Sequence, residues 1–463
     1  MSLHVIILAA GKGSRMKSDI PKVLHKVAGM PMLHRVLSTA KLLAPEQIHL
    51  VLGHGIQAIQ DTLANQWSAA NIVRQAEQLG TGHAVNIALD HVPDDGISLV
   101  LYGDVPLITA ETLEHCVAIA RAGELGIVTA NMSDPARLGR ILRNETDSIE
   151  AIVEHKDATQ QQRAIHEINS GILAAPTRLL RSWLAEVQPS NQQGEYYLTD
   201  VVALAVNDGV SVQGIVVDDA NEIIGVNDRA QLSQVERILQ RRQADELMRQ
   251  GVTLADPERV DIRGTLSCGT DCFIDVNTVF IGDVHLASGV VIGPSVVIES
   301  SQLGAGAQVK ANTVIEGAMI AEGCQLGPFA RIRPGSQFAS GVKIGNFVET
   351  KKTTMGAGSK ASHLAYLGDA VIGMDVNVGA GSVTCNYDGV DKHPTIIGDG
   401  AFVGTNSTVV APLTMGAQSF VAAGSTVTAD VEEHTLALGR VKQRNIARWL
   451  SPLKRKQKKS PDY

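Results

Sequence analysis

Residues 274–298 read IDVNTVFIGDVHLASGVVIGPSVVI, with an apolar side chain at every sixth position. These side chains are Ile274, Phe280, Leu286, Ile292 and Ile298. A helix repeats about every 3.6 residues and a strand about every two, so neither explains a period of six. Three short strands per turn of a triangular coil do explain it, because each side of the coil then points one apolar residue inward.

The same rhythm continues far beyond this stretch. It is found at Leu303, Val309, Ile315, Ile320, Leu326, Ile332, Phe338 and Ile344, and after irregular steps at Ile372, Val378, Thr384, Ile397, Val403, Val409, Met415, Val421 and Val427. A small residue often follows, as in Ile292-Gly293, and lets the chain turn a corner. A glycine-rich antiparallel sandwich would instead alternate with a period of two. The sequence therefore predicts a C-terminal left-handed parallel β-helix of hexapeptide repeats.

Composition fits this prediction and narrows the function. Aromatic residues make up 3% of the 463 residues while glycines number 44, as a narrow aliphatic core with tight corners requires. The length allows two or three domains, and the formal net charge of −8 argues against a general nucleic-acid binder. Five cysteines without a CxxC pair indicate reduced thiols in a cytoplasmic protein. We expect neither a signal peptide nor a membrane span, since no apolar run is long enough.

The N-terminal half alternates strands with helices. Residues 5–10 read as a buried strand, and helices are expected at 32–43, 56–65 and 81–89, with strands at 48–52 and 98–101. This alternation predicts an α/β domain with a doubly wound, Rossmann-like sheet. Ligands of such sheets lie beyond the carboxyl ends of the strands, where Gly11-Lys12-Gly13 and Gly103-Asp104 both fall.

A helical stripe separates the halves. Leu232, Val235, Leu239 and Leu247 recur at helical spacing, and Gly251 ends the pattern. We therefore expect domains at 1–227 and 251–463, a helical linker at 228–250, and a basic C-terminal tail at 454–459. The dense charges of the linker are interpreted as a solvated face.

The run Leu8-Ala9-Ala10-Gly11-Lys12-Gly13-Ser14-Arg15-Met16, with Lys22 after it, is the first motif that carries chemistry. A glycine loop after a first strand lets backbone N–H groups approach phosphate. A glycine-rich turn alone is structural about half the time, and neither GxxxxGK[ST] nor GxGxxG is present. The complete run, however, resembles the signature of nucleotidyltransferases that act on sugar 1-phosphates. That resemblance implies that the loop holds nucleotide while Arg15 and Lys22 meet phosphates.

Two further stretches support this hypothesis. Residues 75–84, QAEQLGTGHA, place Gln side chains and glycine backbone where they can read a base edge, although Thr81 can also simply cap a helix. Asp104 stands at the end of a strand, where a magnesium ligand belongs, with Asn227 as its expected partner. A lone Asp at this position is more often a turn former.

Polar residues interrupt the repeat inside the predicted β-helix. Arg333 lies beside an inward Ile, Lys351 follows a few repeats later, and His363 and Tyr366 come next. An insertion opens near Cys385 and reaches roughly to Pro394. Insertions on one face of a repeat protein commonly line a binding site. A lone His is more often structural, but this one lies among cations and beside an Asn-rich loop.

Taken together, the chain resembles the family of bacterial bifunctional N-acetylglucosamine-1-phosphate uridyltransferase/glucosamine-1-phosphate acetyltransferases. The resemblance covers both halves through the segments LAAGKGSRM, QAEQLGTGHA, LYGDVPL, VEHKDAT, GEYYLTD, GPFARIRPG, GNFVETKK, SHLAYLGDA and NVGAGSVTCNYDG, in this order. Three departures stand out. Thr405 replaces an expected Ser, Ser362 precedes His363 where Gly is common, and Pro135–Leu138 replaces a glycine-rich loop.

The resemblance implies two reactions that end in UDP-N-acetylglucosamine, a precursor for the cell wall. The C-terminal half would move acetyl from acetyl-CoA to glucosamine 1-phosphate, and the N-terminal half would join the product to UTP with Mg²⁺ and release pyrophosphate. It also implies a homotrimer that acts on small molecules. Two alternatives stay open at this point: a uridylyltransferase whose β-helix only oligomerises or regulates, and a non-catalytic sugar-nucleotide scaffold.

The resemblance also assigns residues. UTP or the sugar nucleotide would contact Leu8, Ala9, Ala10, Gly11, Lys22, Gln75, Gly80, Thr81, Tyr102, Gly103, Asp104, Gly139, Glu154, Asn169 and Asn227, with Asp104 and Asn227 on the metal. Arg15 and Lys22 would assist uridylyl transfer, and His363 would be the base of acetyl transfer. The sugar phosphate of the acetyltransferase would contact Arg333, Lys351, Tyr366 and Asn377. Acetyl-CoA would contact Ala380, Asn386, Tyr387, Thr405, Ala423 and Arg440.

Overall fold

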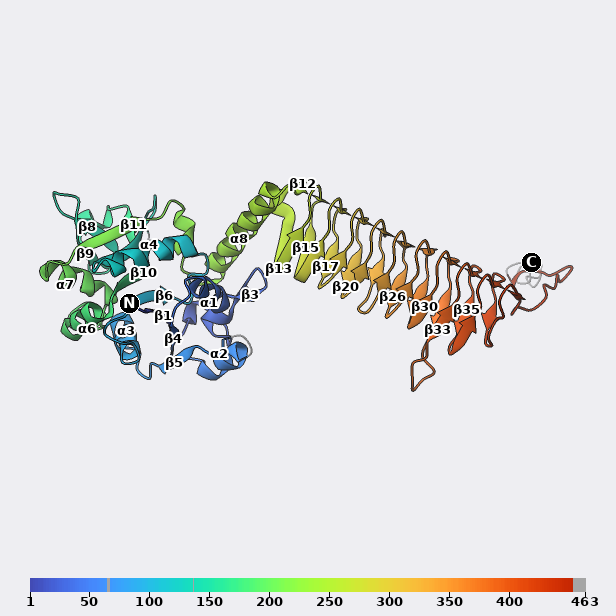
Figure 1. Ribbon diagram of the computed structural model, residues 1–463, viewed down its shortest axis with the longest axis horizontal. Coiled ribbons are helices and arrows are strands. Elements are labelled where there is room, and N and C mark those ends of the chain that lie inside the picture. Colours follow the sequence, from blue (N-terminus) through green and yellow to red (C-terminus); the bar gives the residue numbers. More distant parts are fainter. Residues whose placement is uncertain (65–66, 136, 453–463) are drawn as a thin grey trace, which may run out of the picture. The chain divides into compact units, whose positions relative to one another are not determined.

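The computed structural model describes residues 1–64, 67–135 and 137–452 and contains two compact units (Figure 1). The first comprises Met1–Leu247 with Pro257–Thr265, and the second comprises Met248–Asp256 and the chain from Leu266 onward. The predicted basic tail at 454–459 lies outside the described residues. Among the helices of these described ranges, none combines the length and apolar character needed to cross a bilayer.

The first unit is built on a mixed sheet whose strand order is β11-β7-β10-β6-β1-β4-β5. Strand β1 (Leu3–Ala9) lies between β4 (Gln47–Leu52) and β6 (Ile97–Tyr102), parallel to both. Every residue of β1 is buried, which explains its uninterrupted apolar sequence. The predicted Rossmann-like sheet is confirmed, with β10 (Glu167–Pro176) added as an antiparallel strand beside β6.

Helices cover both faces of this sheet. The remaining strands are β5 (Asn71–Arg74), β7 (Leu125–Asn131), β8 (Arg140–Arg143), β9 (Ile149–Val153) and β11 (Val212–Val216), and the main helices are α1 (Met32–Leu42), α2 (Ile56–Leu63), α3 (Thr81–Leu89), α4 (Ala110–Arg121), α6 (Thr177–Glu186) and α7 (Val201–Asn207). Leu33 of α1 and Leu113 of α4 belong to the core on one face. Val85 of α3 and Trp183 of α6 belong to the core on the other. The helices and strands expected in this half are therefore present.

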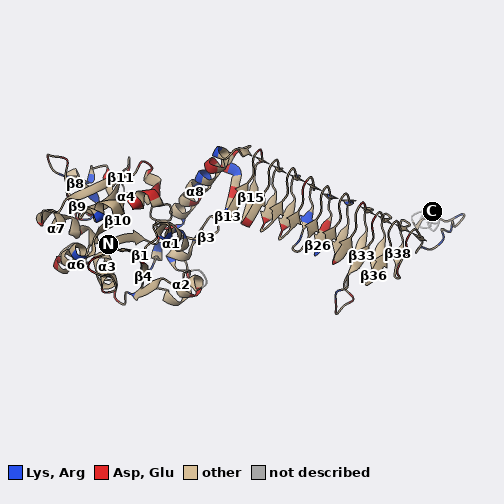
Figure 2. Cartoon of the chain, in the orientation of Figure 1, with Lys and Arg blue, Asp and Glu red and all other residues tan. Residues whose placement is uncertain are grey.

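The predicted linker helix is α8 (Arg229–Arg249), and it packs against the first unit. Val235 is fully buried in a cluster with Met32 and Leu107. Gln240 is buried too, and its side chain accepts from the N–H of Ile262 at 2.7 Å and donates to the carbonyl of Ile262 at 2.9 Å. Charged residues of both signs lie along α8 (Figure 2), but the expectation that they only form a solvated face is wrong. Arg242 pairs with Asp219 at 2.7 Å, and Glu236 accepts from the N–H of Ala28 at 2.6 Å. The contacts thus assign most of this helix to the first unit, while the domain bounds 1–227, 228–250 and 251–463 stay a prediction.

The second unit is the left-handed parallel β-helix. One face is an eleven-stranded sheet made of β12 (Thr253–Leu254), β14 (Phe273–Ile274), β16 (Val291–Ile292), β19 (Gln308–Val309), β22 (Gln325–Leu326), β25 (Lys343–Asn346), β28 (Lys360–His363), β31 (Asn377–Val378), β34 (Phe402–Val403), β37 (Phe420–Val421) and β39 (Leu436–Ala437). Each strand pairs with its counterpart one coil away, as Ile274 does with Ile292 and Ile292 with Val309. The coils therefore stack in register.

The other two faces share one long sheet. Its strands in this unit include β15 (Thr278–Leu286), β17 (Val297–Glu299), β18 (Gln302–Leu303), β20 (Val314–Glu316), β21 (Met319–Ile320), β23 (Arg331–Ile332), β24 (Gln337–Phe338), β26 (Glu349–Lys351), β27 (Thr354–Met355), β29 (Tyr366–Gly368), β30 (Ala370–Ile372), β32 (Val383–Cys385), β33 (Thr395–Ile397), β35 (Thr408–Val410), β36 (Leu413–Met415) and β38 (Thr426–Val427). Figure 1 shows a loop that projects from the coils near β33, where the predicted insertion between Cys385 and Pro394 lies.

All side chains predicted to point inward are buried. The repeat also continues through residues 344–372, where the sequence suggested an interruption. Between Ile344 and Ile372 the buried residues that continue the five- and six-residue steps are Thr350, Met355, Ala361 and Leu367. Thr350 and Ala361 escaped the pattern because neither is strongly apolar. The expectation of irregular steps in this range is therefore wrong. The coils continue, and some of their inward positions hold small or polar side chains.

The glycines that follow inward residues lie where neighbouring coils come closest. A Cβ added at Gly345 would stand 1.8 Å from the carbonyl oxygen of Ser362, and one at Gly404 would stand 2.5 Å from the N–H nitrogen of Ala423. The φ angle of neither glycine lies in the left-handed range. These positions therefore require glycine because the next backbone occupies the space of a side chain.

A stack of imidazole rings lies where β1 and β4 begin. His4 and His49 are buried, their ring centroids are 5.5 Å apart, and His91 also stacks on His49 at 6.4 Å. Asn71 donates to Nδ1 of His49 at 3.1 Å, so Nε2 carries the proton and donates to Nδ1 of His4 at 3.2 Å. Burial, followed by His4 and His91, holds the pKa of His49 at about 4. Burial also lowers the pKa of His4, and the neighbouring Glu46 and Asp95 oppose that shift.

We therefore expect the free energy of unfolding to fall as the pH drops below about 6.5. The unfolded chain takes up a proton on His49 from that pH, whereas the folded chain keeps the ring neutral until about pH 4. Stability is thus complete above this window and is lost within it, by at most about 1.4 kcal/mol per pH unit. Urea unfolding at pH 7.5 and pH 5 measures the difference.

The control is His49→Gln, which keeps a donor for His4 but does not titrate. Its stability should depend less on pH than that of the unaltered chain within the same window. Equal pH dependence of the two proteins would show that the His stack does not cause the loss.

Candidate functional site

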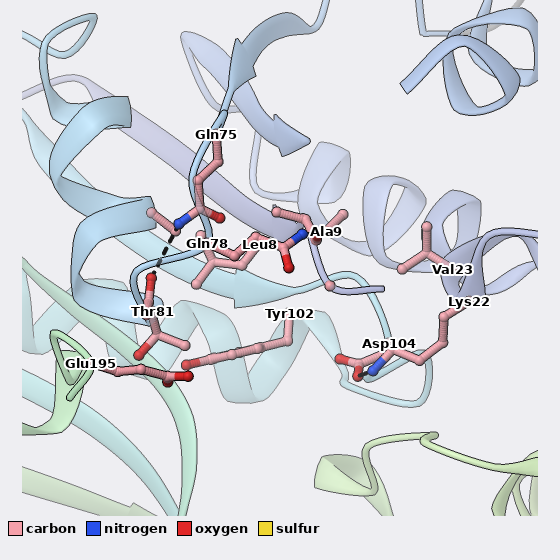
Figure 3. A pocket seen from close by; sticks show the side chains of 14 residues that line it. Leu8, Ala9, Lys22, Val23, Gln75, Gln78, Thr81, Tyr102, Asp104 and Glu195 are labelled. Atoms are coloured by element: carbon pink, nitrogen blue, oxygen red, sulfur yellow. Dashed lines mark hydrogen bonds and ion pairs between the residues drawn. The ribbon is translucent and has the colours of Figure 1, made fainter. Parts of the chain in front are cut away.

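A cavity of about 330 Å³ opens at the carboxyl ends of β1 and β6 in the first unit (Figure 3). Its lining is Leu8, Ala9, Ala10, Gly11, Lys22, Val23, Gln75, Gln78, Gly80, Thr81, Ala84, Tyr102, Asp104 and Glu195. Most of the residues predicted to bind UTP are in this set. Sequence reasoning missed Val23, Gln78, Ala84 and Glu195 as site residues, although Gln78, Ala84 and Glu195 fall in motifs that it quoted.

The glycine loop after β1 shapes one wall of the cavity. Gly13 has a φ of 60°, and a Cβ there would stand 2.6 Å from Cβ of Lys22. Gly13 is therefore required both by its left-handed backbone and by the packing of Lys22. Gly11 lines the cavity and has no heavy atom within 4 Å of where its Cβ would be. The loop thus leaves open space beside Gly11 and holds Lys22 against Gly13.

The loop 75–84 forms another wall and is held by its neighbours. Gln78 donates to the carbonyl of Ala10 at 2.5 Å, and Gln75 donates to the carbonyl of Gly80 at 3.2 Å. Gly80 has a φ of 117°, and a Cβ there would stand 2.5 Å from the carbonyl oxygen of Tyr196. The backbone around Gly80 is therefore fixed beside the cavity rather than free to adjust.

A polar cluster lies at one end of the cavity, where Figure 3 shows Lys22 and Asp104 pointing toward each other. Nζ of Lys22 pairs with the carboxylate of Asp104 and lies 3.4 Å from Oδ1 of Asn227. Arg15 donates to the same Oδ1 at 2.8 Å. The N–H of Val226 donates to the carbonyl of Asp104 at 2.9 Å, which brings Asn227 beside Asp104 despite their separation in sequence.

This cluster suits a divalent cation that also holds a ligand's phosphates. One ammonium contacts both Asp104 and Asn227, so their oxygens converge on a point that a positive charge can occupy. Mg²⁺ commonly takes one or two protein oxygens and completes its shell with phosphate and water. The described residues contain no group of three or more His, Cys, Asp or Glu side chains that could hold a metal.

The predicted sugar residues form a second group in the same unit. The N–H of Asn169 donates to the carbonyl of Gly139 at 3.0 Å, and a Cβ at Gly139 would lie 3.5 Å from the carboxylate of Glu154. Burial raises the pKa of Glu154, partly offset by a hydrogen bond from Thr199 at 3.3 Å. The structure therefore brings Gly139, Glu154 and Asn169 together. Residue 136 of the unusual loop at 135–138 lies outside the described residues.

Tyr102 connects this group to the cavity. Burial raises the pKa of its hydroxyl, and the charges of Glu154 and Asp104 add to the effect. A Cβ at Gly171 would stand 2.6 Å from the Tyr102 ring, so the glycine allows β10 to pack against it. Gly103 follows at the end of β6, and its N–H donates to the carbonyl of Leu8 at 3.0 Å.

The β-helix carries its own cluster of cations. Arg333 follows β23 and pairs with Glu349 of β26 at 2.8 Å. On the next coil, the pKa of Lys351 is lowered, first by Lys392 and then by Arg333. Lys392 comes from the insertion after Cys385 and was missed by the sequence analysis. Its position in the inserted loop was the only available signal.

His363 is the last residue of β28, at an edge of the β-helix, and is exposed. Its Nδ1 lies 2.6 Å from Oδ1 of Asn346, the residue that pairs with it on the previous coil. Tyr366 follows on β29, where it pairs with Glu349. His363 and Tyr366 are therefore separated by a single corner of the chain.

The same edge continues as a row of predicted acetyl-CoA residues. Ala361, Val378, Val403 and Val421 pair one above the other, so the residues two positions later are also stacked. Those residues are His363, Ala380, Thr405 and Ala423, which we call the edge row. Arg440 reaches its far end and donates to the carbonyl of Ala423 at 2.8 Å. Thr405 keeps the position expected for a Ser.

Three predicted residues lie elsewhere on the prism. Asn377 pairs with Lys360 on the eleven-stranded face, away from the face that holds Lys351. Asn386 begins the insertion and donates to Asp369 at 2.5 Å. Asp369 follows β29, whereas the first residue of the edge row precedes β29. Tyr387 follows it, more than half exposed. One chain therefore gathers neither Asn377 with Lys351 nor Asn386 and Tyr387 with the edge row.

Comparisons with known proteins agree with both halves of the chain. A family model described as the MobA-like NTP transferase domain matches residues 5–193. The protein named Bifunctional protein GlmU from Marinobacter nauticus is 54% identical, with 98% of this chain and 99% of the relative covered. The proteins of the same name from Stutzerimonas stutzeri and Alkalilimnicola ehrlichii are 52% and 50% identical, with at least 97% of each chain covered. The resemblance seen in the sequence is confirmed: the chain belongs to the family of bifunctional GlmU proteins.

Proposed function

We propose that the two units divide the two reactions of a bifunctional enzyme that makes UDP-N-acetylglucosamine. The first unit transfers uridylyl from UTP to N-acetylglucosamine 1-phosphate, and the β-helix transfers acetyl from acetyl-CoA to glucosamine 1-phosphate. The observation that carries this proposal is that each unit has its own cluster of cations beside a distinct binding surface. Both reactions need such clusters because both substrates carry phosphate.

Uridylyl transfer requires little covalent help from the protein. The sugar phosphate must lie in line with the α-phosphorus of UTP, and the developing charge must be neutralised. Arg15 and Lys22 supply positive charge at one end of the cavity. When bound, Mg²⁺ would be held by Asp104 and Asn227 and would neutralise phosphate oxygens. Lys22, which pairs with Asp104, would contact a phosphate of the nucleotide.

The rest of the cavity suits the uridine. The fixed backbone around Gly80 and the side chains of Gln75 and Gln78 offer hydrogen-bonding groups beside apolar Leu8 and Ala9. Such groups select one base, because a wrong base would leave their donors and acceptors without hydrogen-bond partners. Gly139, Glu154 and Asn169 form the proposed sugar site on the other side of Tyr102.

Acetyl transfer needs a base, because an ammonium group cannot attack a thioester. Nε2 of His363 takes the proton as the amine nitrogen bonds to the thioester carbonyl carbon. The carbon–sulfur bond then breaks, and the CoA thiolate leaves with the electron pair. Arg333, Lys351 and Lys392 hold the sugar phosphate, with Tyr366 beside it. Lys392 and Arg333 lower the pKa of Lys351 because the three cations lie close together, and such a cluster favours binding of an anion.

The edge row gives acetyl-CoA an extended path that ends at the base. Adjacent coils are about 4.8 Å apart, so the three steps from His363 to Ala423 span roughly 14 Å. A pantetheine arm along this row places the thioester near His363 and the CoA phosphates toward Arg440. A uridylyltransferase with a merely oligomerising β-helix would not need this row of residues beside a cation cluster.

The division of acetyl-CoA residues between two edges of the prism supports a homotrimer. Asn386 and Tyr387 lie on the other side of β29 from the edge row. Side chains on different edges of one prism can meet only when two copies pack side by side. Exposed apolar residues on the coils, among them Met319 and Val371, are consistent with such packing.

The assignment of Asp104 is tested by the Asp104→Ala variant. It should lose at least about 100-fold in pyrophosphate release, because it removes a carboxylate that would hold the metal opposite the phosphates. Release of CoA thiol should be unchanged, since that reaction belongs to the other unit. Asp94→Ala is the matched control, as it removes an exposed carboxylate that pairs with Arg181 of the same unit. Equal loss of both activities in Asp104→Ala would contradict the assignment.

His363→Ala tests the proposed base. The kcat of acetyl transfer should fall by roughly 10²-fold to 10⁴-fold, the usual contribution of a general base. Acetyl-CoA binding, uridylyl transfer and the melting temperature should barely change because His363 is exposed and fills no core position. A folded variant that keeps most of its acetyl-transfer kcat would rule out this role.

The proposed trimer can be weighed directly. Light scattering at the concentration used for activity assays should give the mass of three chains. A monomer with full acetyltransferase activity would overturn the proposal that a second copy completes the site.

A further inference from the structure

We infer that Asn346 positions His363 as the base, an inference that rests on the function proposed above for the β-helix. Nδ1 of His363 lies 2.6 Å from Oδ1 of Asn346. An amide oxygen can only accept a hydrogen bond, so Nδ1 must carry the proton of the neutral ring. Nε2 is then left with the lone pair. The contact thus selects the tautomer that can accept a proton at Nε2 and fixes the direction in which that lone pair points.

The backbone holds the two side chains in register. Asn346 and His363 are paired residues of β25 and β28, and the N–H of Leu364 donates to the carbonyl of Asn346 at 3.0 Å. Gly345 lets the coils come this close, because a Cβ there would stand 1.8 Å from the carbonyl oxygen of Ser362. Both side chains are also followed by a residue in the left-handed region, with φ of 57° at Phe347 and 49° at Leu364. The 2.6 Å contact is therefore built into the coil geometry.

An amide suits this position better than a carboxylate. A carboxylate beside an imidazole stabilises the protonated ring, and a protonated ring cannot act as a base. The uncharged amide orients the ring without that effect. The charged side chains on the two strands are Lys343 and Lys360, three positions before Asn346 and His363. Like the amide, these cations do not favour the protonated form of the His363 ring. Asn346 therefore orients His363 while leaving it free to accept a proton.

The first test replaces the amide by an apolar group of similar size. Asn346→Leu should lower the kcat of acetyl transfer roughly 10-fold or more, since it removes part of a general base's contribution. The KM for acetyl-CoA and the rate of uridylyl transfer should stay as they are. Gln325→Leu is the matched control, because it makes the same polar-to-apolar change on the preceding strand of the same sheet. Its acetyl transfer should equal that of the unaltered protein.

The second test keeps an acceptor but adds a charge. Asn346→Asp should move the acidic limb of the acetyl-transfer pH profile upward by about one pH unit or more, as a carboxylate within about 4–6 Å does to a cationic group. Activity should approach that of the unaltered protein at high pH, where the ring is again neutral. A merely structural role for Asn346 would not move the profile. The inference is overturned if Asn346→Asp keeps the original profile, and this readout also decides the case if Asn346→Leu does not fold.

A double-variant cycle separates this inference from the proposed base. If Asn346 acts through His363, adding Asn346→Leu to His363→Ala should cause no further loss of acetyl-transfer kcat. A further loss equal to that of Asn346→Leu alone would overturn the positioning role. If instead His363→Ala by itself retains full acetyl transfer, the proposed base is wrong, whatever the Asn346 variants do. The two failures are thus distinguishable.

Discussion

The β-helix depends on one constraint, which is that each coil pairs its backbone with the next in register. Residues in equivalent positions are then stacked at about 4.8 Å, so a single coil position becomes a row along the prism. Glycine is required wherever this spacing places a carbonyl in the space of a Cβ, as at Gly345. The same stacking creates the edge row from His363 to Ala423 and the contact between Asn346 and His363. Fold and proposed acetyl-CoA path therefore have one physical cause.

In the first unit, distant residues are brought together by loops at one edge of the sheet rather than by stacked coils. Its parallel strands end at one edge of the sheet, and the loops after them bring distant residues together there. Asp104 follows β6, and Asn227 lies far along the chain, yet a backbone hydrogen bond from Val226 places them side by side. Lys22 completes the group because the glycine loop holds it against Gly13. Its ammonium pairs with the carboxylate of Asp104, whose side chain is only 16% exposed.

Both units place Lys and Arg side chains where a phosphate is expected, but these cations contact different partners. In the sheet unit, Lys22 and Arg15 rest on Asp104 and Asn227. In the β-helix, Arg333 rests on Glu349, whereas Lys351 faces Lys392 and its pKa is lowered as a result. Close cations repel each other until an anion arrives, so binding of a phosphate relieves the repulsion. This arrangement would give the proposed phosphate binding an electrostatic origin.

Local pattern was enough to predict much of this protein. The period of six determined the β-helix, because inward side chains recur wherever the coil returns to the same face. The apolar run at 5–10, with the glycine loop after it, determined the first strand and the place of the cavity at its carboxyl end. Only the tertiary structure decided what depends on separate segments meeting. It brought Lys392 to Lys351, packed α8 against the first unit through Val235, and set Asn386 on a different edge from Thr405. Spacing along the chain fixes which way a side chain points within its own coil, strand or helix, but contacts across coils and loops depend on register, insertion length and packing, which no local pattern contains.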